Sequence, residues 1–238
     1  MKTVIVTGAS QGIGAAITQM FLERGYNVVA TSRTLSARNV FAISKRLALV
    51  DGDIGDASTA ERVTRIALET FGSIDALVNN AGIFIPKPFI DYTAADFQAL
   101  VSTNLSGFIA MSQLVIKQML AQQSGGSIVS ITSSLADNPI AGLPASLPMI
   151  TKGGLNAVAR SLAIEYAKDR IRVNTVSPGV VDTPLLKDQP KDFLRSLSPL
   201  GQIADSKDIA AAVVYLTEAK QITGEVFHVD GGAHIGKW

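Results

Sequence analysis

The sequence predicts an α/β protein with a doubly wound parallel sheet, and three observations support this fold class. Short apolar segments rich in Val and Ile alternate with longer amphipathic segments, which is the pattern of βα units on a parallel sheet. The 238 residues are 47% hydrophobic and 17% charged, which is enough for one large core. No internal repeat interrupts the alternation. We therefore expect one domain over residues 1–238, with about seven parallel strands flanked by helices on both faces.

The expected elements follow from this alternation. The strands are predicted over residues 3–8, 27–32, 47–53, 76–81, 126–133, 172–179 and 225–232. The helices are predicted over residues 12–25, 56–71, 93–123, 150–168 and 206–217. Residues 184–203 have weak periodicity and follow the carboxyl end of a strand, where ligands bind in open α/β sheets. We predict that this segment is a mobile lid over a substrate, the alternative being an ordinary surface excursion.

Composition excludes several classes of function. The 21 Lys and Arg nearly balance the 20 Asp and Glu, so no general field favours nucleic acid. Cysteine is absent, and both histidines, His228 and His234, fall in the last eleven residues. We therefore predict no metal site and no His-based triad. The start of the chain is too short and too polar for a signal-peptide core, and no run approaches the roughly 20 apolar residues of a membrane span. These features predict a cytoplasmic protein.

The segment TGASQGIG, residues 7–14, follows a predicted strand and opens a predicted helix, the context that a dinucleotide-binding turn requires. Gly8 permits the tight turn, Gly12 lets the backbone approach a pyrophosphate, and Gly14 lets the helix pack closely on the sheet. Free N–H groups at the helix start then face the phosphates. We predict a Rossmann-type site in which Ser10, Gln11 and Ile13 also contact the cofactor. The alternative is a glycine-rich turn without a ligand.

The end of the second strand indicates which cofactor is preferred. An NAD site places Asp or Glu roughly 20 residues after the turn to bind the adenosine ribose, whereas this chain has Ser32 and Arg33 there. A guanidinium favours a 2′-phosphate through charge-assisted hydrogen bonds. Arg38 adds a second charge if the 34–45 connection folds back. Asp53 is expected to accept from the adenine amino group, with Ile54 packing on the ring. We predict that NADP(H) is preferred over NAD(H).

Further motifs are similar to those of one family. These motifs are TGASQGIG at 7–14, NNAG at 79–82, Asn104-Leu-Ser-Gly, Ser133-Ser134, Lys152, SPGVVDTP at 177–184 and VDGG at 229–232. Together they resemble the short-chain dehydrogenase/reductase family over essentially the whole chain. The resemblance implies that the cofactor contacts include Asn80, Ala81, Gly82, Lys152, Pro178, Gly179, Val181 and Thr183. It also implies a small-molecule substrate, a bulge at Asn104 in a long helix, a relay water held by Asn104, and a homo-oligomer, either dimer or tetramer.

The chain departs from the family pattern at its expected acid. In the family, a tyrosine delivers a proton and a serine polarises the carbonyl. The tyrosine stands four residues before the lysine, because residues i and i+4 share a helix face. Position 148 is Pro148, and Tyr92 and Tyr166 are poorly placed to substitute. The spacing from Ser134 to position 148 is also one residue longer than in the family pattern. Proline is tolerated in the first turn of a helix.

Three functions remain open from the sequence. The first is an NADP(H)-dependent oxidoreductase acting on a carbonyl or alcohol, an enone or a quinone, with Asn104, Ser134 and Lys152 as catalytic residues. Its atypical proton source would be water or a relay through Ser134, Ser146 or Thr151. The second is a non-catalytic NADP(H)-binding sensor or structural subunit. The third uses the same pocket for elimination or isomerisation.

Overall fold

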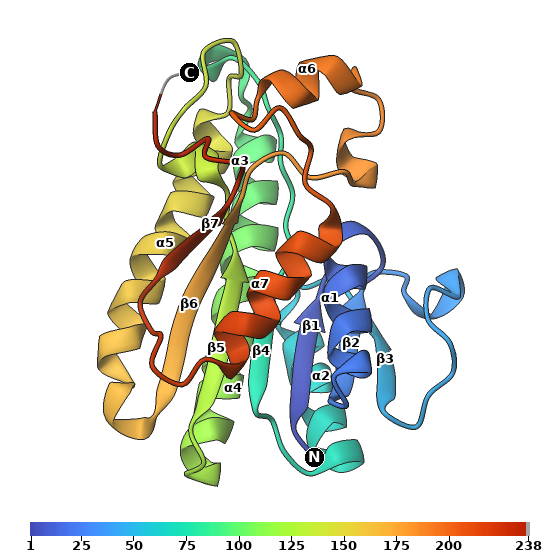
Figure 1. The fold of residues 1–238 in the computed structure, drawn as a ribbon. Coiled ribbons are helices and arrows are strands. Elements are labelled where there is room, and N and C mark those ends of the chain that lie inside the picture. Colours follow the sequence, from blue (N-terminus) through green and yellow to red (C-terminus); the bar gives the residue numbers. More distant parts are fainter. Residues whose placement is uncertain (237–238) are drawn as a thin grey trace.

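The computed structural model describes residues 1–236, so residues 237 and 238 of the expected domain lie outside the described part. One seven-stranded sheet, all of it parallel, runs through this part in the order β3-β2-β1-β4-β5-β6-β7. Helices cover both faces of the sheet (Figure 1). The predicted fold class, a doubly wound α/β sheet, is confirmed.

The strands lie where the apolar segments predict them. They are β1 (Thr3–Thr7), β2 (Asn27–Ser32), β3 (Leu47–Asp51), β4 (Ala76–Asn79), β5 (Gly126–Ile131), β6 (Ile171–Pro178) and β7 (Val226–Val229). Several strands end one to three residues before the predicted boundary. In each of these cases the extra residues belong to a loop at the carboxyl edge, where the backbone leaves the sheet towards the cavity described below.

The helices alternate with the strands. The α-helices are α1 (Gly12–Glu23), α2 (Ala57–Phe71), α3 (Ala94–Leu100), α4 (Gly107–Gln122), α5 (Ser146–Glu165), α6 (Lys191–Ser196) and α7 (Ser206–Glu218). A π-helical segment, η3 (Val101–Ser106), joins α3 to α4. Short 3₁₀ turns are η1 (Ser36–Arg38), η2 (Phe89–Asp91), η4 (Ser134–Ala136), η5 (Ala167–Asp169) and η6 (Pro184–Leu186).

Two cores lie on opposite faces of the sheet. On one face α1 and α7 contribute Phe21 and Val213. On the other face α2, α4 and α5 contribute residues such as Val63 and Met111. Alternate residues of each strand feed the two cores, because successive side chains of a strand point to opposite faces. The apolar segments are therefore continuous along the buried strands.

The region predicted as one long helix, residues 93–123, contains a bulge. Residues Ala94–Gln122 run as helix throughout, but six of them, Val101–Ser106, have π-helical hydrogen bonding. By length and composition this helix could cross a membrane. Its buried residues, among them Met111 and Val115, pack in the core against the sheet, so it is a core helix of this fold.

The strand order reverses between β1 and β4, which are neighbours in the sheet but are connected through β2 and β3. At such a switch point the loops after the two strands diverge and leave a crevice at the carboxyl ends. In Figure 1 this edge is the upper one, where η4, α6 and the C-terminal segment gather. The topology therefore places the candidate site between the loops after β1, β4 and β5.

Candidate functional site

One cavity of about 540 Å³ lies at this crevice. Its wall contains every site residue predicted from the sequence except Asn104, which is buried behind it. The set in the wall is Gly8, Ser10, Gln11, Gly12, Ile13, Gly14, Ser32, Arg33, Asp53, Ile54, Asn80, Ala81, Gly82, Ser134, Lys152, Pro178, Gly179, Val181 and Thr183. Residues spread over most of the chain thus meet at one site.

The glycine-rich turn joins β1 to α1, and its glycines are required by space. Gly8 has a φ of +68°, and a Cβ added there would lie 2.8 Å from the Cα of Ala81. A Cβ on Gly14 would lie 2.2 Å from the carbonyl oxygen of Gly8. A Cβ on Gly12 would lie 3.2 Å from the Thr183 side chain across the cavity. The structural roles expected for Gly8 and Gly14, a tight turn and close packing, are therefore confirmed.

The start of α1 has no side-chain cap, in contrast to the starts of α2 and α7. Side chains of Asp56 and Asp205 cap α2 and α7 by accepting from backbone N–H groups. Gln11, at the corresponding position of α1, makes no such bond. Gly12, Ile13 and Gly14 of the first turn of α1 line the cavity, and the partial positive charge of a helix N-terminus attracts anions. This end of the cavity can hold a phosphate.

The loop after β4 braces the turn. The Thr7 hydroxyl oxygen accepts from the N–H groups of Asn80 and Ala81, both at 3.0 Å. The Asn80 side chain donates in return to the carbonyl oxygens of Thr7 at 2.9 Å and Gly8 at 3.1 Å. These reciprocal bonds fix the two loops relative to each other across the switch point.

The residues after β2 close the cavity at the expected adenosine end. Arg38 donates to the Gln11 side chain at 3.2 Å, so the 34–45 connection folds back onto the glycine-rich turn as the sequence suggested it could. Asp51 holds this fold by accepting from the backbone N–H groups of Leu35 and Ser36. Hydrogen bonds from Ser36 lower the pKa of the Asp51 carboxyl. Arg33 is exposed at the cavity wall.

The other residues predicted at this end lie beside the arginines. Ser32 donates to the Ser10 hydroxyl at 3.0 Å. Asp53 is exposed, and its Oδ1 already accepts from the N–H of Gly55 at 2.9 Å. Ile54 is 8% exposed and packs over Gly107, where an added Cβ would lie 2.9 Å from it. An apolar surface and an accessible carboxylate therefore lie together here.

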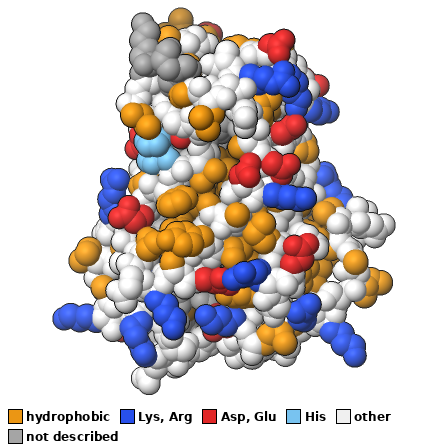
Figure 2. Space-filling view, in the orientation of Figure 1, with side chains coloured by type: hydrophobic (Ala, Val, Ile, Leu, Met, Phe, Trp, Pro, Cys, Tyr) orange, Lys and Arg blue, Asp and Glu red, His pale blue; other side chains and the backbone are white. Residues whose placement is uncertain are grey.

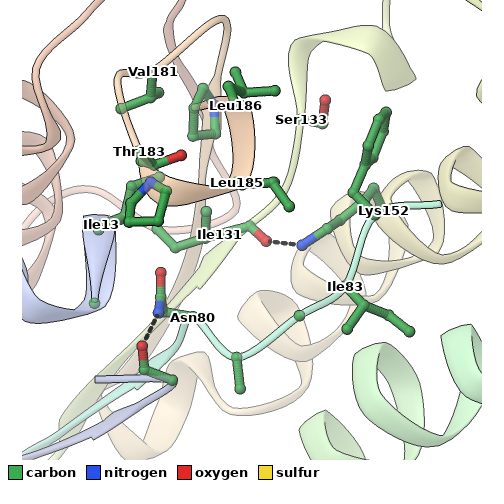
Figure 3. Close-up of a pocket in the computed structure, with 18 of the residues that line it drawn as sticks. Ile13, Asn80, Ile83, Ile131, Ser133, Lys152, Val181, Thr183, Leu185 and Leu186 are labelled. Atoms are coloured by element: carbon green, nitrogen blue, oxygen red, sulfur yellow. Dashed lines mark hydrogen bonds between the residues drawn. The ribbon is translucent and has the colours of Figure 1, made fainter. Parts of the chain in front are cut away.

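A buried polar cluster lies at the opposite end of the cavity. Lys152 on α5 is 9% exposed, and its Nζ donates to the carbonyl oxygen of Ile131 at 2.8 Å (Figure 3). Burial lowers the pKa of Lys152 to about 8. Asn104 accepts from the N–H of Ile83 at 2.9 Å and donates to the Thr151 hydroxyl at 3.0 Å. A Cβ on Gly82 would lie 3.2 Å from the Lys152 Nζ and 3.3 Å from Asn104.

Pro148 occupies the third residue of α5, which begins four residues earlier than predicted. Its missing N–H therefore costs no intrahelical bond, and its carbonyl oxygen accepts from the Thr151 hydroxyl at 2.8 Å. Ser134 is 4% exposed in the cavity wall, despite the longer loop that follows it. Ser133, which was not predicted as a site residue, also lines the cavity.

Most of the remaining side chains in the cavity wall are apolar, and they were only partly predicted. Residues 184–203 fold as η6 and α6 over the opening and contribute Leu185, Leu186, Phe193, Leu194 and Leu197. The loops after β4 and β5 contribute Ile83, Phe84, Pro86, Leu135, Ile140 and Leu143. The sequence analysis did not predict these loop residues, although apolar residues between two motifs could have indicated a substrate pocket.

The loop after β5 is tied to the C-terminal segment. The Asn138 side chain donates to the carbonyl oxygens of Ala233 at 2.7 Å and Gly236 at 3.3 Å. His228 lies 3.0 Å from Asp137, and its ring stacks on that of His234 with centroids 3.7 Å apart. Ala233 itself lines the cavity. The end of the chain therefore positions one wall of the site.

Comparisons with known proteins agree with this architecture. The family model described as enoyl-(acyl carrier protein) reductase matches residues 8–234. Carbonyl reductase family member 4 of Xenopus laevis is 35% identical over 236 residues, which cover 98% of each chain. The chain belongs to the short-chain dehydrogenase/reductase family.

Two solved structures are similar over nearly their whole length. ElxO with NADP bound has a TM-score of 0.91 and 27% identity, covering 99% of each chain. The 3-ketoacyl-(acyl-carrier-protein) reductase from Brucella melitensis, complexed with NADH, has a TM-score of 0.91 and 31% identity, covering 98% of each chain.

Proposed function

We propose that this protein is an NADP(H)-dependent oxidoreductase that interconverts a carbonyl and an alcohol, or reduces an enone or quinone. The observation that carries the proposal is a single cavity that joins an uncapped helix N-terminus, Arg33 and the buried Lys152, with Arg38 bonded to Gln11 of its wall. Bound NADP(H) would supply or accept the hydride. The relatives named above include a carbonyl reductase and a structure with NADP.

The residues present fit that cofactor. The N–H groups at the start of α1 offer donors to a pyrophosphate, and Gly12 leaves room for its approach. Ser10, Gln11, Ile13, Asn80, Ala81 and Gly82 surround this position, and Pro178, Gly179, Val181 and Thr183 form the facing wall. Lys152 has two N–H donors beyond the one given to Ile131, and one of these can bind a ribose hydroxyl.

The preference for NADP(H) over NAD(H) rests on charge. Arg33 and Arg38 both lie at the end of the cavity where the adenosine 2′-position is expected. Arginine binds phosphate through paired, charge-assisted hydrogen bonds. The Asp51 carboxylate at the end of β3 is engaged by Leu35 and Ser36. Asp53 and Ile54 would contact the adenine. Among the relatives, one structure holds NADP and another holds NADH. The proposal of NADP(H) for this chain therefore rests on the two arginines.

The substrate half of the cavity favours an apolar, uncharged molecule. Leu185, Leu186 and Phe193 approach from residues 184–203, and Leu135 and Ile140 approach from the loop after β5. Burial of such surface contributes about 25 cal/mol per Å². We propose that residues 184–203 act as a lid, because they fold over the opening as short helices, with the Lys191–Asp182 ion pair at 2.6 Å on their outer part.

The proton source must differ from the family pattern. If Pro148 stands where relatives carry the acidic tyrosine, this position has no proton to deliver. Ser134 and Asn104 remain as candidates for polarising the substrate oxygen and for ordering a relay water. Loss of a general acid typically reduces the rate by about 10² to 10⁴, which a slow enzyme or a substrate needing little acid assistance can tolerate.

We also propose that the protein is a cytoplasmic homo-oligomer. Exposed apolar side chains on the long helices support the oligomer: Ile109 on α4 is 50% exposed, and Ile150 and Ile164 on α5 are 55% and 79% exposed. The family resemblance implies subunit contacts through these helices and through the C-terminal strand.

Pro148 also favours a second candidate function, a non-catalytic NADP(H)-binding sensor or structural subunit. The two functions predict different behaviour. A sensor changes its assembly or partner affinity when NADPH binds and does not oxidise it with any substrate. An enzyme oxidises NADPH in a substrate-dependent way.

The test compares wild type with Pro148→Tyr on one panel of apolar ketones, aldehydes, enones and quinones, following NADPH oxidation. The enzyme reading predicts that wild type turns over at least one compound and that the added tyrosine changes this rate little. Activity confined to Pro148→Tyr would show that the site is competent but lacks its acid, and would favour the sensor. A fold control is needed, because tyrosine replaces a buried proline.

A further inference from the structure

Hydride transfer is expected at the end of the cavity that holds Lys152. Among the described residues that line this end, Lys152 is the one whose side chain can lose a proton near neutral pH. The other protic groups in this part of the wall are hydroxyls of serine and threonine, which do not titrate in proteins. We propose that the Lys152 ammonium is the general acid that replaces the missing tyrosine and delivers its proton directly to the substrate oxygen. This inference rests on the proposed function.

The relays that the sequence left open are less suited than Lys152. The Thr151 hydroxyl is fully buried, donates to the Pro148 carbonyl and accepts from Asn104. Ser146 is exposed outside the cavity wall. The Tyr92 hydroxyl donates to the carbonyl oxygen of Ile85 at 2.7 Å and is absent from that wall. Ser134 lines the cavity, and it can polarise an oxygen as a neutral donor.

The position of Lys152 suits proton delivery. Its Nζ enters the cavity between the end of β5 and the loop after β4, with Leu185 and Ile83 on either side (Figure 3). One N–H is used by Ile131, which leaves two for ligands. The carbonyl of Ile131 anchors the amine beside the space that Gly82 leaves open by having no Cβ.

The groups that face Lys152 within the described part of the chain are neutral. They are the Ile131 carbonyl from β5, Gly82 after β4 and the Asn104 amide from η3. Of the charged groups in the described cavity wall, Arg33 and Asp53 lie after β2 and β3, on the far side of β1 and β4 in the sheet. Asp137, Asp230, His228 and His234 pair with one another near the C-terminal segment. Burial alone therefore lowers the pKa of Lys152, to about 8.

A general acid works best when its pKa lies near the working pH. As the substrate carbonyl carbon gains a hydride, the C=O π electrons move onto the oxygen. One Nζ–H bond of Lys152 breaks, and an O–H bond forms on that oxygen. Lys152 is left as a neutral amine and regains a proton from solvent. In the oxidative direction the neutral amine accepts the proton from the alcohol.

The ability of Lys152 to lose its proton explains why this side chain tolerates burial without a carboxylate partner among the described residues. A buried ammonium is unstable relative to the neutral amine, and a pKa of about 8 leaves both forms accessible near neutral pH. A lysine that only bound ribose hydroxyls would not need a pKa close to neutral pH. The apolar surroundings thus adjust the group for proton exchange.

The experiment uses full-length wild type, Lys152→Arg and Lys152→Met, with Lys168→Arg as the control because Lys168 is exposed on η5. Arginine keeps the charge but holds its proton, and methionine fills the volume without a proton to give. Three quantities are measured: the pH profile of NADPH-dependent reduction, the Kd for NADPH, and the titration of ¹³C-labelled lysine ε-carbons without cofactor.

The expected wild-type reduction rate is level below about pH 8 and falls tenfold per pH unit above it, since only the ammonium gives a proton. Both Lys152 variants lose about 10² to 10⁴ in rate. Lys152→Arg still offers an N–H donor to the ribose, so its Kd for NADPH changes by less than about tenfold, whereas Lys152→Met loses the donor and binds NADPH about 10- to 100-fold more weakly. One ε-carbon resonance titrates near pH 8 in wild type and is missing from both variants.

Three results overturn the proposal. In the first, wild type is active and Lys152→Arg keeps both the wild-type rate and the fall in rate at alkaline pH. This result would overturn this inference alone and leave the proposed function standing. A loss of rate matched by an equal loss of NADPH affinity would assign Lys152 to holding the cofactor. Absence of turnover by wild type with every substrate would remove the proposed function and this inference together.

Discussion

Arg33, Lys152 and Pro148 set the chemistry of the cavity at the scale of single residues. Arg33 is exposed at one end, and Lys152 is buried at the other, without a charged partner among residues 1–236. Pro148 lies in the first turn of the helix that carries Lys152. The spatial requirement for Gly8 and Gly14 could be predicted from the TGASQGIG spacing. The contact between Arg38 and Gln11 could not, because it depends on how a connection without periodicity folds.

Removal of the Arg33 guanidinium tests the cofactor preference. We expect Arg33→Ala to weaken NADPH binding by about 10- to 100-fold, since a hydrogen bond to a charged group is worth roughly 1.5–3 kcal/mol. NADH binding should change little, because NADH has no 2′-phosphate. Fluorescence titration with both nucleotides measures this, with Arg65→Ala on the exposed face of α2 as the control. An equal loss for NADPH and NADH would contradict the assignment.

At the scale of elements, the structure differs from the sequence expectations where periodicity is weakest. Helix α5 begins at Ser146 rather than at the predicted residue 150. The prediction started too late because the first turn contains proline and has no apolar repeat. Helix α6 has only six residues, too few for a periodic pattern. The bulge near Asn104 was implied by family resemblance and is present as η3. Periodicity alone predicted an unbroken helix there.

The loop after β5 depends on the C-terminal segment for its position. We expect Asn138→Ala to free this loop, since the side chain holds the carbonyl oxygens of Ala233 and Gly236. A lost hydrogen bond of about 0.5–1.5 kcal/mol would lower kcat/KM by roughly 2- to 13-fold. Amide exchange measured by mass spectrometry should accelerate in residues 135–143, with helix α4 as the internal reference. Unchanged exchange in the loop would show that Asn138 does not hold it.

At the scale of the whole molecule, apolar surface remains uncovered in the single chain. Figure 2 shows hydrophobic side chains gathered on the face that carries β7 and α7. Tyr215 on α7 and Phe227 on β7 are 53% and 38% exposed, and their rings lie 6.1 Å apart. Large exposed apolar patches mark interaction surfaces. The family resemblance implies contacts through the helices at 93–123 and 150–168 and through the C-terminal strand, but only the fold shows which of their residues face outwards.

An oligomer built on α5 should be sensitive to charge at Ile164, which is 79% exposed. We expect wild type to have the mass of a dimer or tetramer in light scattering. Ile164→Glu should shift this mass towards a smaller species, because a carboxylate is costly to bury in an apolar interface. Lys168→Glu, just beyond the helix, serves as the charge control. A wild-type protein that is monomeric at high concentration would contradict the expected assembly.

The central claim is that the cavity transfers a hydride between NADP(H) and an apolar carbonyl although position 148 is proline. The most direct measurement gives wild type NADPH deuterated at the transferring carbon together with the ketone, aldehyde, enone and quinone panel, and analyses the products by mass spectrometry. The account predicts one deuterium on the reduced carbon of at least one ketone, aldehyde or enone product. If NADPH binds tightly and no compound in the panel is reduced, the protein is a nucleotide-binding protein rather than an oxidoreductase.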